Sequence, residues 1–293
     1  MTTLIGRAFT FVAASLLLTT IAVRARATET TSDLVQASLV ADAATIAPGS
    51  AFTLAVRMKI APHWHTYWIN PGESGEPTKI KWSGPKGLTF GDIRWPTPHK
   101  IIMDGAITYG YENEVLLMVP VTASKELAAS GDATIEADVS WLSCKEVCIE
   151  GGAKLSIKLP VGEKKTSANE ALFAAWKKRT PVNVDSPAAA MVAKMEQPVG
   201  PDGQPLPTLS INWKKTPKKV EWYPAATAAI AIEDVKVNHQ ADKTVVGFAP
   251  TVFQPEEAAG GVVGGVLVFE NEAGERVGVN APVKVPMKAI DSK

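Results

Sequence analysis

The stretch ATIEADVSWLSCKEVCIEGGAKLSIKLPV, residues 133–161, decides the fold prediction. Its two ends, ATIEADVSWL and AKLSIKLPV, alternate apolar and polar residues, which is typical of strands with one buried face. Between them lie Cys144 and Cys148, the only two cysteines of the chain. A four-residue step along an extended strand spans about 13 Å, well beyond the roughly 7 Å limit for a disulfide, so a bonded pair requires a turn at residues 145–147. The stretch therefore predicts a hairpin with the cysteine pair at or near its tip.

Short alternating runs of the same kind recur from residue 34 to residue 161, separated by Pro and Gly clusters. Besides the two runs above they are LVQASLVAD (34–42), AFTLAVRMKI (51–60), KIKWSG (79–84) and NEVLLMVPVTA (113–123). This pattern predicts an antiparallel β-sandwich, and we assign it to a first domain of residues 28–161.

The alternation of apolar and polar residues stops after residue 161, and we predict a helical connector of residues 162–205. Ser167 and Glu170 form a capping-box pattern that predicts a helix of about three turns, which Pro181 ends. Ser186 and Pro187 indicate a second, shorter helix, with Ser as N-cap and Pro in the first helical position.

Strand-like runs return in residues 206–293, again with turn residues between them. They are TLSINW (208–213), AAIAIEDVKVN (228–238), KTVVGFAP (243–250), GGVVGGVLVFE (260–270) and RVGVNAPVKVP (276–286). We predict a second β-sandwich, which contains no cysteine. The whole chain is therefore expected to be all-β except for its connector.

Residues 1–27 have the pattern of a secretory signal peptide. Arg7 precedes an apolar run that ends in Ala25-Arg26-Ala27, a small-x-small cleavage pattern. The run of about 16 apolar residues is short for a membrane span, and no later segment is long enough for one. We therefore expect a periplasmic protein with no stable membrane insertion after cleavage. That compartment is oxidising, so the cysteine pair is expected to be disulfide-bonded at rest unless something reduces it.

Composition excludes some functions. The chain has 30 Lys and Arg against 30 Asp and Glu, and the predicted signal peptide removes three arginines and no acid. A balance this close to neutral predicts no nucleic-acid partner.

The residues alone leave three roles open for the cysteine pair. A structural bridge that closes five residues contributes only about 2 kcal/mol, so the short loop favours redox use over a staple. Lys145 favours a thiolate while Glu146 and Glu150 oppose it, so the nucleophile is not decided. A zinc or copper site is the third role, with His63 and His65 in HWHTYW as weak candidate ligands and Met103 as a soft one. We expect no metal and no other cofactor.

Four motifs carry a resemblance to a known family: HWHTYWINPGESGEPTKIKW (63–82), IRWPTPHKI (93–101), ITYGYENEVLLMVPV (107–121) and WLSCKEVCIEGG (141–152). Together and in this order they resemble the periplasmic N-terminal domain of the thiol:disulfide interchange protein DsbD. The resemblance is closest to the branch found in the copper-sensitivity suppressor ScsB, which links the chain to copper tolerance and cytochrome c biogenesis.

The resemblance implies an immunoglobulin-like domain in which Cys144 and Cys148 are the catalytic pair of a thiol-disulfide oxidoreductase. The expected partners are a membrane-embedded reductase of the DsbD or ScsB type and periplasmic thioredoxin-like acceptors. In the family a cap shields the cysteines, and the candidates here are Met103, Asp104, Trp64, Tyr67, Tyr109 and Tyr111. The cap sequence and the cysteine spacing both depart from DsbD itself. The alternative function is a protein-binding or copper-binding module in which the disulfide is structural.

Overall fold

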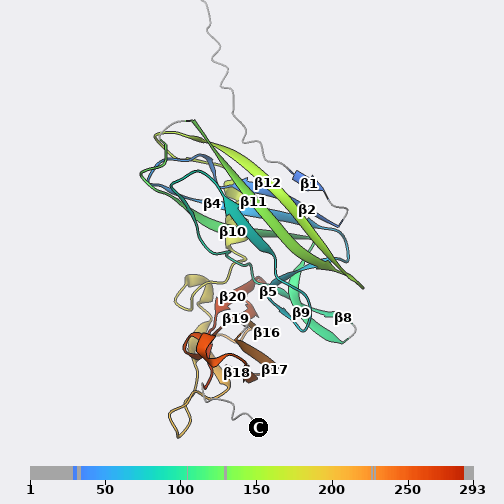
Figure 1. The fold of residues 1–293 in the computed structure, drawn as a ribbon. Coiled ribbons are helices and arrows are strands. Elements are labelled where there is room, and N and C mark those ends of the chain that lie inside the picture. Colours follow the sequence, from blue (N-terminus) through green and yellow to red (C-terminus); the bar gives the residue numbers. More distant parts are fainter. Residues whose placement is uncertain are drawn as a thin grey trace, which may run out of the picture.

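The computed structural model describes residues 29–31, 34–103, 105–128, 131–225, 227 and 229–286. These residues form two β-sandwiches, the first above the second in Figure 1. The prediction of an all-β chain with two sandwiches and a helical connector is confirmed. The predicted signal peptide and Asp104 lie outside the described residues, and the predicted domain boundaries remain predictions.

Two antiparallel sheets make up the first sandwich. One has the strand order β1-β2-β4-β10-β7, and the other has the order β12-β11-β5-β9-β8 with β6 paired to β11. The strands of the first sheet are β1 (Glu29–Thr31), β2 (Val35–Ala41), β4 (Ala51–Ile60), β10 (Glu114–Ala123) and β7 (Leu88–Phe90). Those of the second are β12 (Cys148–Val161), β11 (Gly131–Cys144), β5 (His65–Gly72), β9 (Ala106–Glu112), β8 (His99–Met103) and β6 (Lys79–Ser83).

The burial pattern explains which strands form the core. In β11 every odd-numbered residue from Ala133 to Ser143 is buried, as the alternation predicts. Across from it, β4 and β10 contribute Leu54, Val56 and Leu117 to the same core. Removing this apolar surface from water is the main force that holds the two sheets together.

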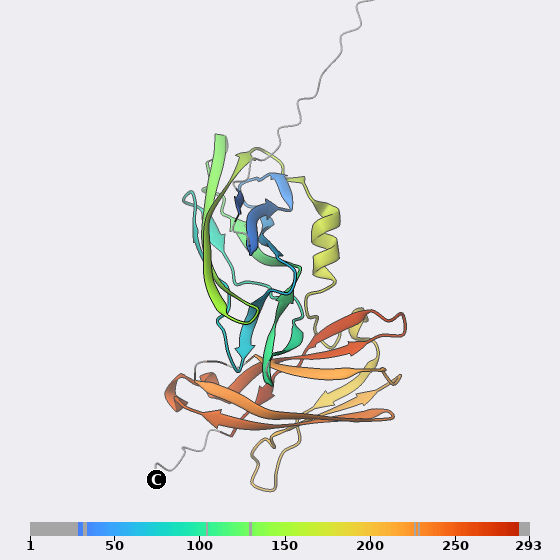
Figure 2. The ribbon, with the colours of Figure 1, turned by 90° about the vertical axis from the view of Figure 1, so that its right-hand side faces the viewer.

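The connector packs on the first sandwich through a short strand and one α-helix. Strand β13 (Thr166–Ser167) pairs with β3 (Ala43–Thr45), and α1 (Glu170–Lys177) lies along the side of the sandwich in Figure 2. The helix buries Phe173 and Trp176 in the core of the first domain. Beyond it lies the 3-10 helix η1 (Pro187–Ala189), where the Ser186 side chain accepts from the Ala188 N–H as predicted.

The predicted capping box is wrong, and the helix is shorter than expected. Ser167 lies in β13, while Asn169 is the N-cap residue, in a left-handed conformation and without a side-chain capping bond. The Asn169 amide instead donates to the Ala41 carbonyl at 2.9 Å, so pairing with the sandwich replaces the cap.

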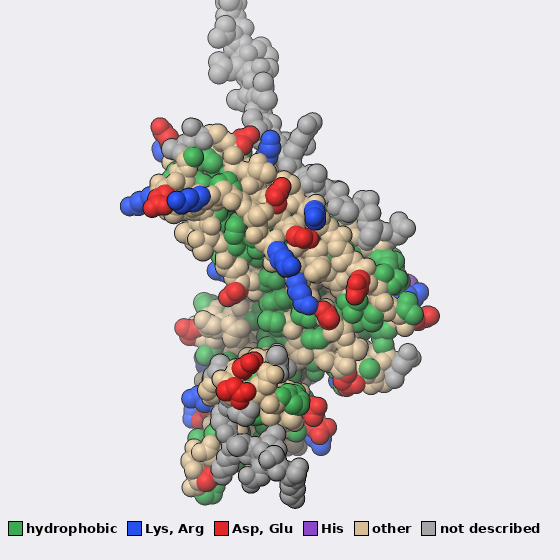
Figure 3. Space-filling view, viewed as in Figure 1, with side chains coloured by type: hydrophobic (Ala, Val, Ile, Leu, Met, Phe, Trp, Pro, Cys, Tyr) green, Lys and Arg blue, Asp and Glu red, His purple; other side chains and the backbone are tan. Residues whose placement is uncertain are grey.

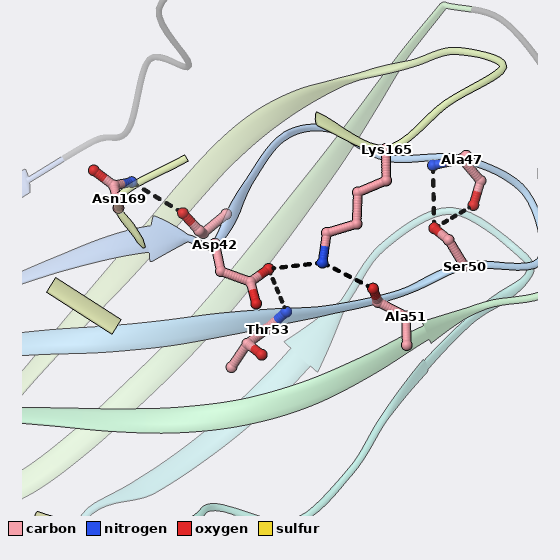
Figure 4. A network of polar contacts seen from close by, with 8 residues as sticks. Asp42, Ala47, Ser50, Ala51, Thr53, Lys165 and Asn169 are labelled. Atoms are coloured by element: carbon pink, nitrogen blue, oxygen red, sulfur yellow. Dashed lines mark hydrogen bonds and ion pairs between the residues drawn. The ribbon is translucent and has the colours of Figure 1, made fainter. Parts of the chain in front are cut away.

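Figure 4 shows how the connector is attached beside this point. The Asp42 carboxylate accepts from the Thr53 N–H at 2.8 Å and lies 3.4 Å from the Lys165 ammonium. Lys165 also donates to the Ala51 carbonyl at 3.0 Å. The start of the connector is thus held by main-chain pairing and by one partly buried ion pair.

The second sandwich also has two antiparallel sheets, with strand orders β14-β15-β18-β17 and β16-β19-β20, the latter with β21 on β19. The first contains β14 (Val192–Glu196), β15 (Thr208–Trp213), β18 (Lys243–Val252) and β17 (Ile230–Gln240). The second contains β16 (Val220–Ala225), β19 (Val262–Glu270), β20 (Arg276–Asn280) and β21 (Val283–Lys284). Two 3-10 helices, η2 (Pro255–Glu257) and η3 (Ala259–Gly261), precede β19.

A packed interface joins the sandwiches. Asn70 of β5 donates to the Pro224 carbonyl of β16 at 2.6 Å in a buried contact, and the Tyr109 and Tyr223 rings lie 5.0 Å apart. Arg276 of β20 donates to the carbonyls of Thr97 and Pro98. Strand β5 is therefore fixed at one end by the second domain.

Candidate redox site

The cysteines close the hairpin of β11 and β12. These strands pair along their full length, from Gly131 opposite Val161 to Cys144 opposite Cys148. Residues 145–147 form the loop, and the two cysteines are disulfide-bonded with their Cα atoms 4.2 Å apart. The prediction of a hairpin with the pair at its tip is confirmed, and this tip projects at the right of Figure 1.

The two cysteines differ in exposure. Cys144 is only 3% exposed, whereas Cys148 is exposed to solvent. The sheet order is the cause, because β11 has β12 on one side and β5 on the other, while β12 is an edge strand. A protein partner can therefore reach the sulfur of Cys148 more readily than that of Cys144.

The pair lies on the outer face of its sheet. Cys144 belongs to the even-numbered residues of β11, which point away from the core, and it pairs with His65 of β5. Because side chains alternate along a strand, Tyr67 points to the same face as His65. This register brings an imidazole and a phenol to the disulfide.

Tyr67 contacts the disulfide directly. Its hydroxyl oxygen lies 3.6 Å from the Cys148 sulfur, and because a disulfide sulfur carries no hydrogen, the hydroxyl is the donor of this contact. The side chain is 1% exposed, and burial raises the pKa of Tyr67 while a hydrogen bond with the Ser74 side chain lowers it. The net effect is a rise in pKa, so the hydroxyl stays protonated at neutral pH.

His65 is buried behind the pair. Its ring makes an edge contact with Tyr67 at 5.0 Å between centroids, and its Nε2 atom has no hydrogen-bond partner in the described part of the chain. Burial lowers the pKa of His65, which favours the neutral imidazole. The sequence offered no reason to place this histidine at the cysteines, and strand register is what brings it there.

His63 does not share the face of His65. It lies in the turn before β5, exposed and with a φ of 69°, so the two histidines do not form a ligand pair on one strand. Among the described residues there is no group of three His, Cys, Asp or Glu side chains that could hold a metal ion.

The other predicted cap residues lie in different places. Trp64 is half-buried against the core of the first domain, and the Tyr111 hydroxyl donates to the Pro96 carbonyl at 2.7 Å inside that core. Tyr109 packs between Trp68 and Tyr223 at the interface. Met103 pairs with Ala106 at the end of β8 and is half-buried. Their role as a cap remains a prediction.

The loop of residues 73–77 also belongs to this site, and the sequence does not predict it. Gly75 has a φ of 100°, and a Cβ atom there would lie 2.2 Å from the Tyr67 ring, so the glycine backbone lies directly on that ring. Pro77 forms an isolated bridge with Tyr67, and Glu76 is paired with Lys79 at 2.7 Å. No local pattern in the sequence reveals this contact, because it joins the loop to a strand whose residues 65–68 are all buried.

Apolar side chains surround the tip. Val147 in the loop is 63% exposed and Ile149, next to Cys148, is 41% exposed. Figure 3 shows hydrophobic atoms gathered on the right, where the β11–β12 and β8–β9 hairpins end. Exposed large aliphatic residues next to an accessible sulfur are suited to a protein partner.

A large cleft of the described structure lies away from the cysteines. A cleft of about 770 Å³ separates β5 and β9 of the first domain from β16 and β17 of the second, and neither cysteine lines it. Exchange with a protein disulfide requires access to a sulfur, so we place the candidate site at the hairpin tip.

The fold and the site define a class: an immunoglobulin-like β-sandwich with a solvent-accessible disulfide at a hairpin tip. Residues 33–165 match the model of the family described as "Thiol:disulfide interchange protein DsbD, N-terminal". The resemblance drawn from the four motifs is thereby confirmed. The matched family and the close cysteine pair fit a thiol-disulfide exchange module.

Solved structures add a match over both domains. The N-terminal periplasmic domain of ScsB from Proteus mirabilis superposes with a TM-score of 0.61 at 18% identity, covering 88% of this chain and 98% of that one. At this identity the match shows a shared fold. The periplasmic chaperone SfaE gives a TM-score of 0.24 at 9% identity, covering 82% of this chain and 98% of that one. The comparison with curated sequences finds no match.

Proposed function

We propose that this protein is a periplasmic thiol-disulfide exchange module that relays electrons through Cys144 and Cys148. The observation that carries the proposal is the disulfide at an exposed hairpin tip, with one buried and one accessible cysteine. In the relay a membrane-embedded reductase of the DsbD or ScsB type reduces the pair. The reduced pair then passes two electrons to a periplasmic thioredoxin-like acceptor.

The two cysteines have different roles in this scheme. The Cys148 thiolate attacks the acceptor disulfide, forming a mixed disulfide and expelling the first acceptor sulfur as a thiolate. The Cys144 thiolate then attacks the Cys148 sulfur, which restores the intramolecular bridge and releases the second acceptor sulfur. The assignment follows from exposure, because the attacking sulfur must meet its partner while the resolving sulfur has only to reach its neighbour.

The proposed location is the periplasm, reached through a cleaved signal peptide of residues 1–27. The structural neighbour is described as a periplasmic domain, and an oxidising compartment suits a bridge that needs a dedicated reductant. Among the described residues no helix is long and apolar enough to cross a membrane. Mass spectrometry of the N-terminus of protein secreted by a Gram-negative host tests the cleavage.

A trapping experiment tests the assignment of roles. We expect Cys144→Ser protein to accumulate a mixed disulfide at Cys148 when it is mixed with an oxidised thioredoxin-like protein, because the resolving thiol is missing. Cys148→Ser protein, prepared as the matched control, should form at least about tenfold less adduct, because Cys144 is buried. Equal trapping by both variants, or trapping by neither, would contradict the proposal.

A further inference from the structure

One predicted shielding residue makes a contact that shielding does not require. The Tyr67 hydroxyl faces the sulfur of Cys148, whereas the hydroxyl of Tyr111 donates to a core carbonyl and Tyr109 packs against the second domain. A residue that only excluded water could present the edge of its ring. Tyr67 instead brings its one polar atom to the accessible sulfur.

The loop of residues 73–77 holds the hydroxyl in this position. Ser74 hydrogen-bonds to it, and the Gly75 backbone lies on the ring. Gly75 has a φ of 100°, a region that L side chains rarely adopt, so the close approach and the backbone shape both require glycine. The loop is joined to β9 where the Glu73 N–H donates to the Ile107 carbonyl at 3.0 Å. The phenol is therefore pre-positioned before any partner arrives.

We propose that Tyr67 is a catalytic residue of the exchange reaction, donating a hydrogen bond to the Cys148 sulfur whenever that sulfur carries negative charge. The inference rests on the proposed function and names a residue for the same site. In the reduced protein the Cys148 thiol gives its proton to solvent, and the Tyr67 O–H donates to the thiolate that remains. During attack the negative charge moves to the departing sulfur of the acceptor. Tyr67 keeps its own proton throughout.

The chemistry of the donor fits this role. Hydrogen bonds to ionised groups are stronger than neutral ones, so the hydroxyl stabilises the thiolate of Cys148 more than its thiol. Tyr67 is buried, so its hydroxyl stays protonated at neutral pH and can donate. The hydrogen bond favours the thiolate of Cys148, which is the form that reacts.

The test is the pH dependence of iodoacetamide alkylation of Cys148 in a Cys144→Ser background, where Cys148 is the sole thiol. Tyr67→Phe removes the hydroxyl and keeps the ring. Tyr109→Phe is the matched control, because that tyrosine lies on β9 of the same sheet without contacting the disulfide. The charged and titratable groups on neighbouring elements stay unchanged in both variants; they are His65, Glu73, Glu76, Glu112, Lys145, Glu146 and Glu150.

We expect Tyr67→Phe to move the midpoint of the pH profile upward by about one unit, the equivalent of one hydrogen bond to an ionised group. The thiolate fraction at neutral pH then falls about tenfold. A more basic thiolate is about threefold more nucleophilic, so the alkylation rate falls about threefold at pH 7 and rises about threefold at high pH. The two profiles therefore cross. The Tyr109→Phe profile should overlie that of the parent.

A purely shielding role gives a different result. Loss of shielding would raise the rate at every pH and leave the midpoint unmoved, and that outcome would overturn the proposal. If Tyr67→Phe does not fold, Ser74→Ala replaces it, because that variant removes the hydrogen bond that holds the Tyr67 hydroxyl. An upward shift of the midpoint of the pH profile would then support the proposal. An unmoved midpoint would overturn it. No partner protein takes part, so failure of the relay in the trapping experiment is read separately from this result.

Discussion

The two long hairpins of this protein have similar geometry but differ in what their tips contact. The β11–β12 hairpin ends in a disulfide and an exposed Val147, and it projects from the sandwich. The β17–β18 hairpin ends at Ala241 and Asp242, and the Asp242 carbonyl accepts from the Trp213 N–H of its own sheet at 2.7 Å. The first hairpin projects its tip from the sandwich (Figure 1), whereas the main chain at the tip of the second hydrogen-bonds to its own sheet.

Strand β5 connects the two domains. At its start His65 and Tyr67 face the disulfide, and further along Asn70 donates to the Pro224 carbonyl of the second domain. The disulfide and the side chains that face it thus belong to the first domain, and the second domain contacts the strand that carries His65 and Tyr67. A cysteine-free domain can in this way affect a redox site that it does not touch.

The largest effects are expected from core substitutions, one in each domain, which distinguish the role of the first domain from that of the second. Trp222→Ala removes a 2% exposed indole that stacks on Phe248 in the second core, and Trp141→Ala removes a 5% exposed indole over Gly151 in the first. Each should lower the free energy of unfolding of its own domain by about 3–5 kcal/mol. Denaturant unfolding followed alongside the rate of disulfide reduction checks this.

The redox readout should differ between the two tryptophan variants. Trp141 lies three residues from Cys144, so its removal should accelerate reduction of the disulfide, while Trp222→Ala should leave that rate within about twofold of the parent. Equal acceleration in both would show that the second core supports the site as directly as the first.

A smaller effect is expected at the interface. Arg276 donates to the carbonyls of Thr97 and Pro98 and to the Tyr223 hydroxyl, so Arg276→Ala should cost about 2 kcal/mol of unfolding free energy. Hydrogen exchange should also increase in β8, which follows Pro98. Arg94→Ala is the control at an exposed arginine and should change stability by less than about 0.5 kcal/mol. Equal losses of unfolding free energy in the two arginine variants would contradict a specific role for Arg276.

The smallest effect compares two glycines with positive φ. Gly75→Ala places a Cβ atom on the Tyr67 ring, whereas Gly274→Ala, at a φ of 76°, meets nothing within 4 Å. Both substitutions place an L side chain at a positive φ and share that strain. Gly75→Ala should therefore lower the free energy of unfolding by about 1 kcal/mol more than Gly274→Ala, because of overpacking. Thermal unfolding measures this difference, and a smaller loss at Gly75 would mean that the loop does not press on Tyr67.

The sequence predicts those strands that have one wet face. The run ATIEADVSWL alternates because β11 is buried on one side only, and AFTLAVRMKI falls on β4 from its first residue to its last. Strand β5 was missed because four consecutive residues, 65–68, are buried and leave no period to read.

The site could be predicted only in part, because some of its contacts join residues that are distant in the sequence. The cysteines and the turn between them follow from spacing and from strand geometry. The positions of His65 and Tyr67 depend on the register between β5 and β11, whose paired residues are about 80 positions apart in the chain. The loop at Gly75 and the interface at Asn70 are tertiary contacts without a local pattern.

The reduction potential of the Cys144–Cys148 couple distinguishes a thiol-disulfide exchange module from a protein with a structural bridge. The mature protein is equilibrated in graded thiol buffers, and the trapped free thiols are counted. We expect a potential between those of thioredoxin and the oxidising periplasmic enzymes, roughly −270 to −120 mV, where the pair can pass electrons downhill. A value well below about −300 mV would mark a structural bridge and contradict the account.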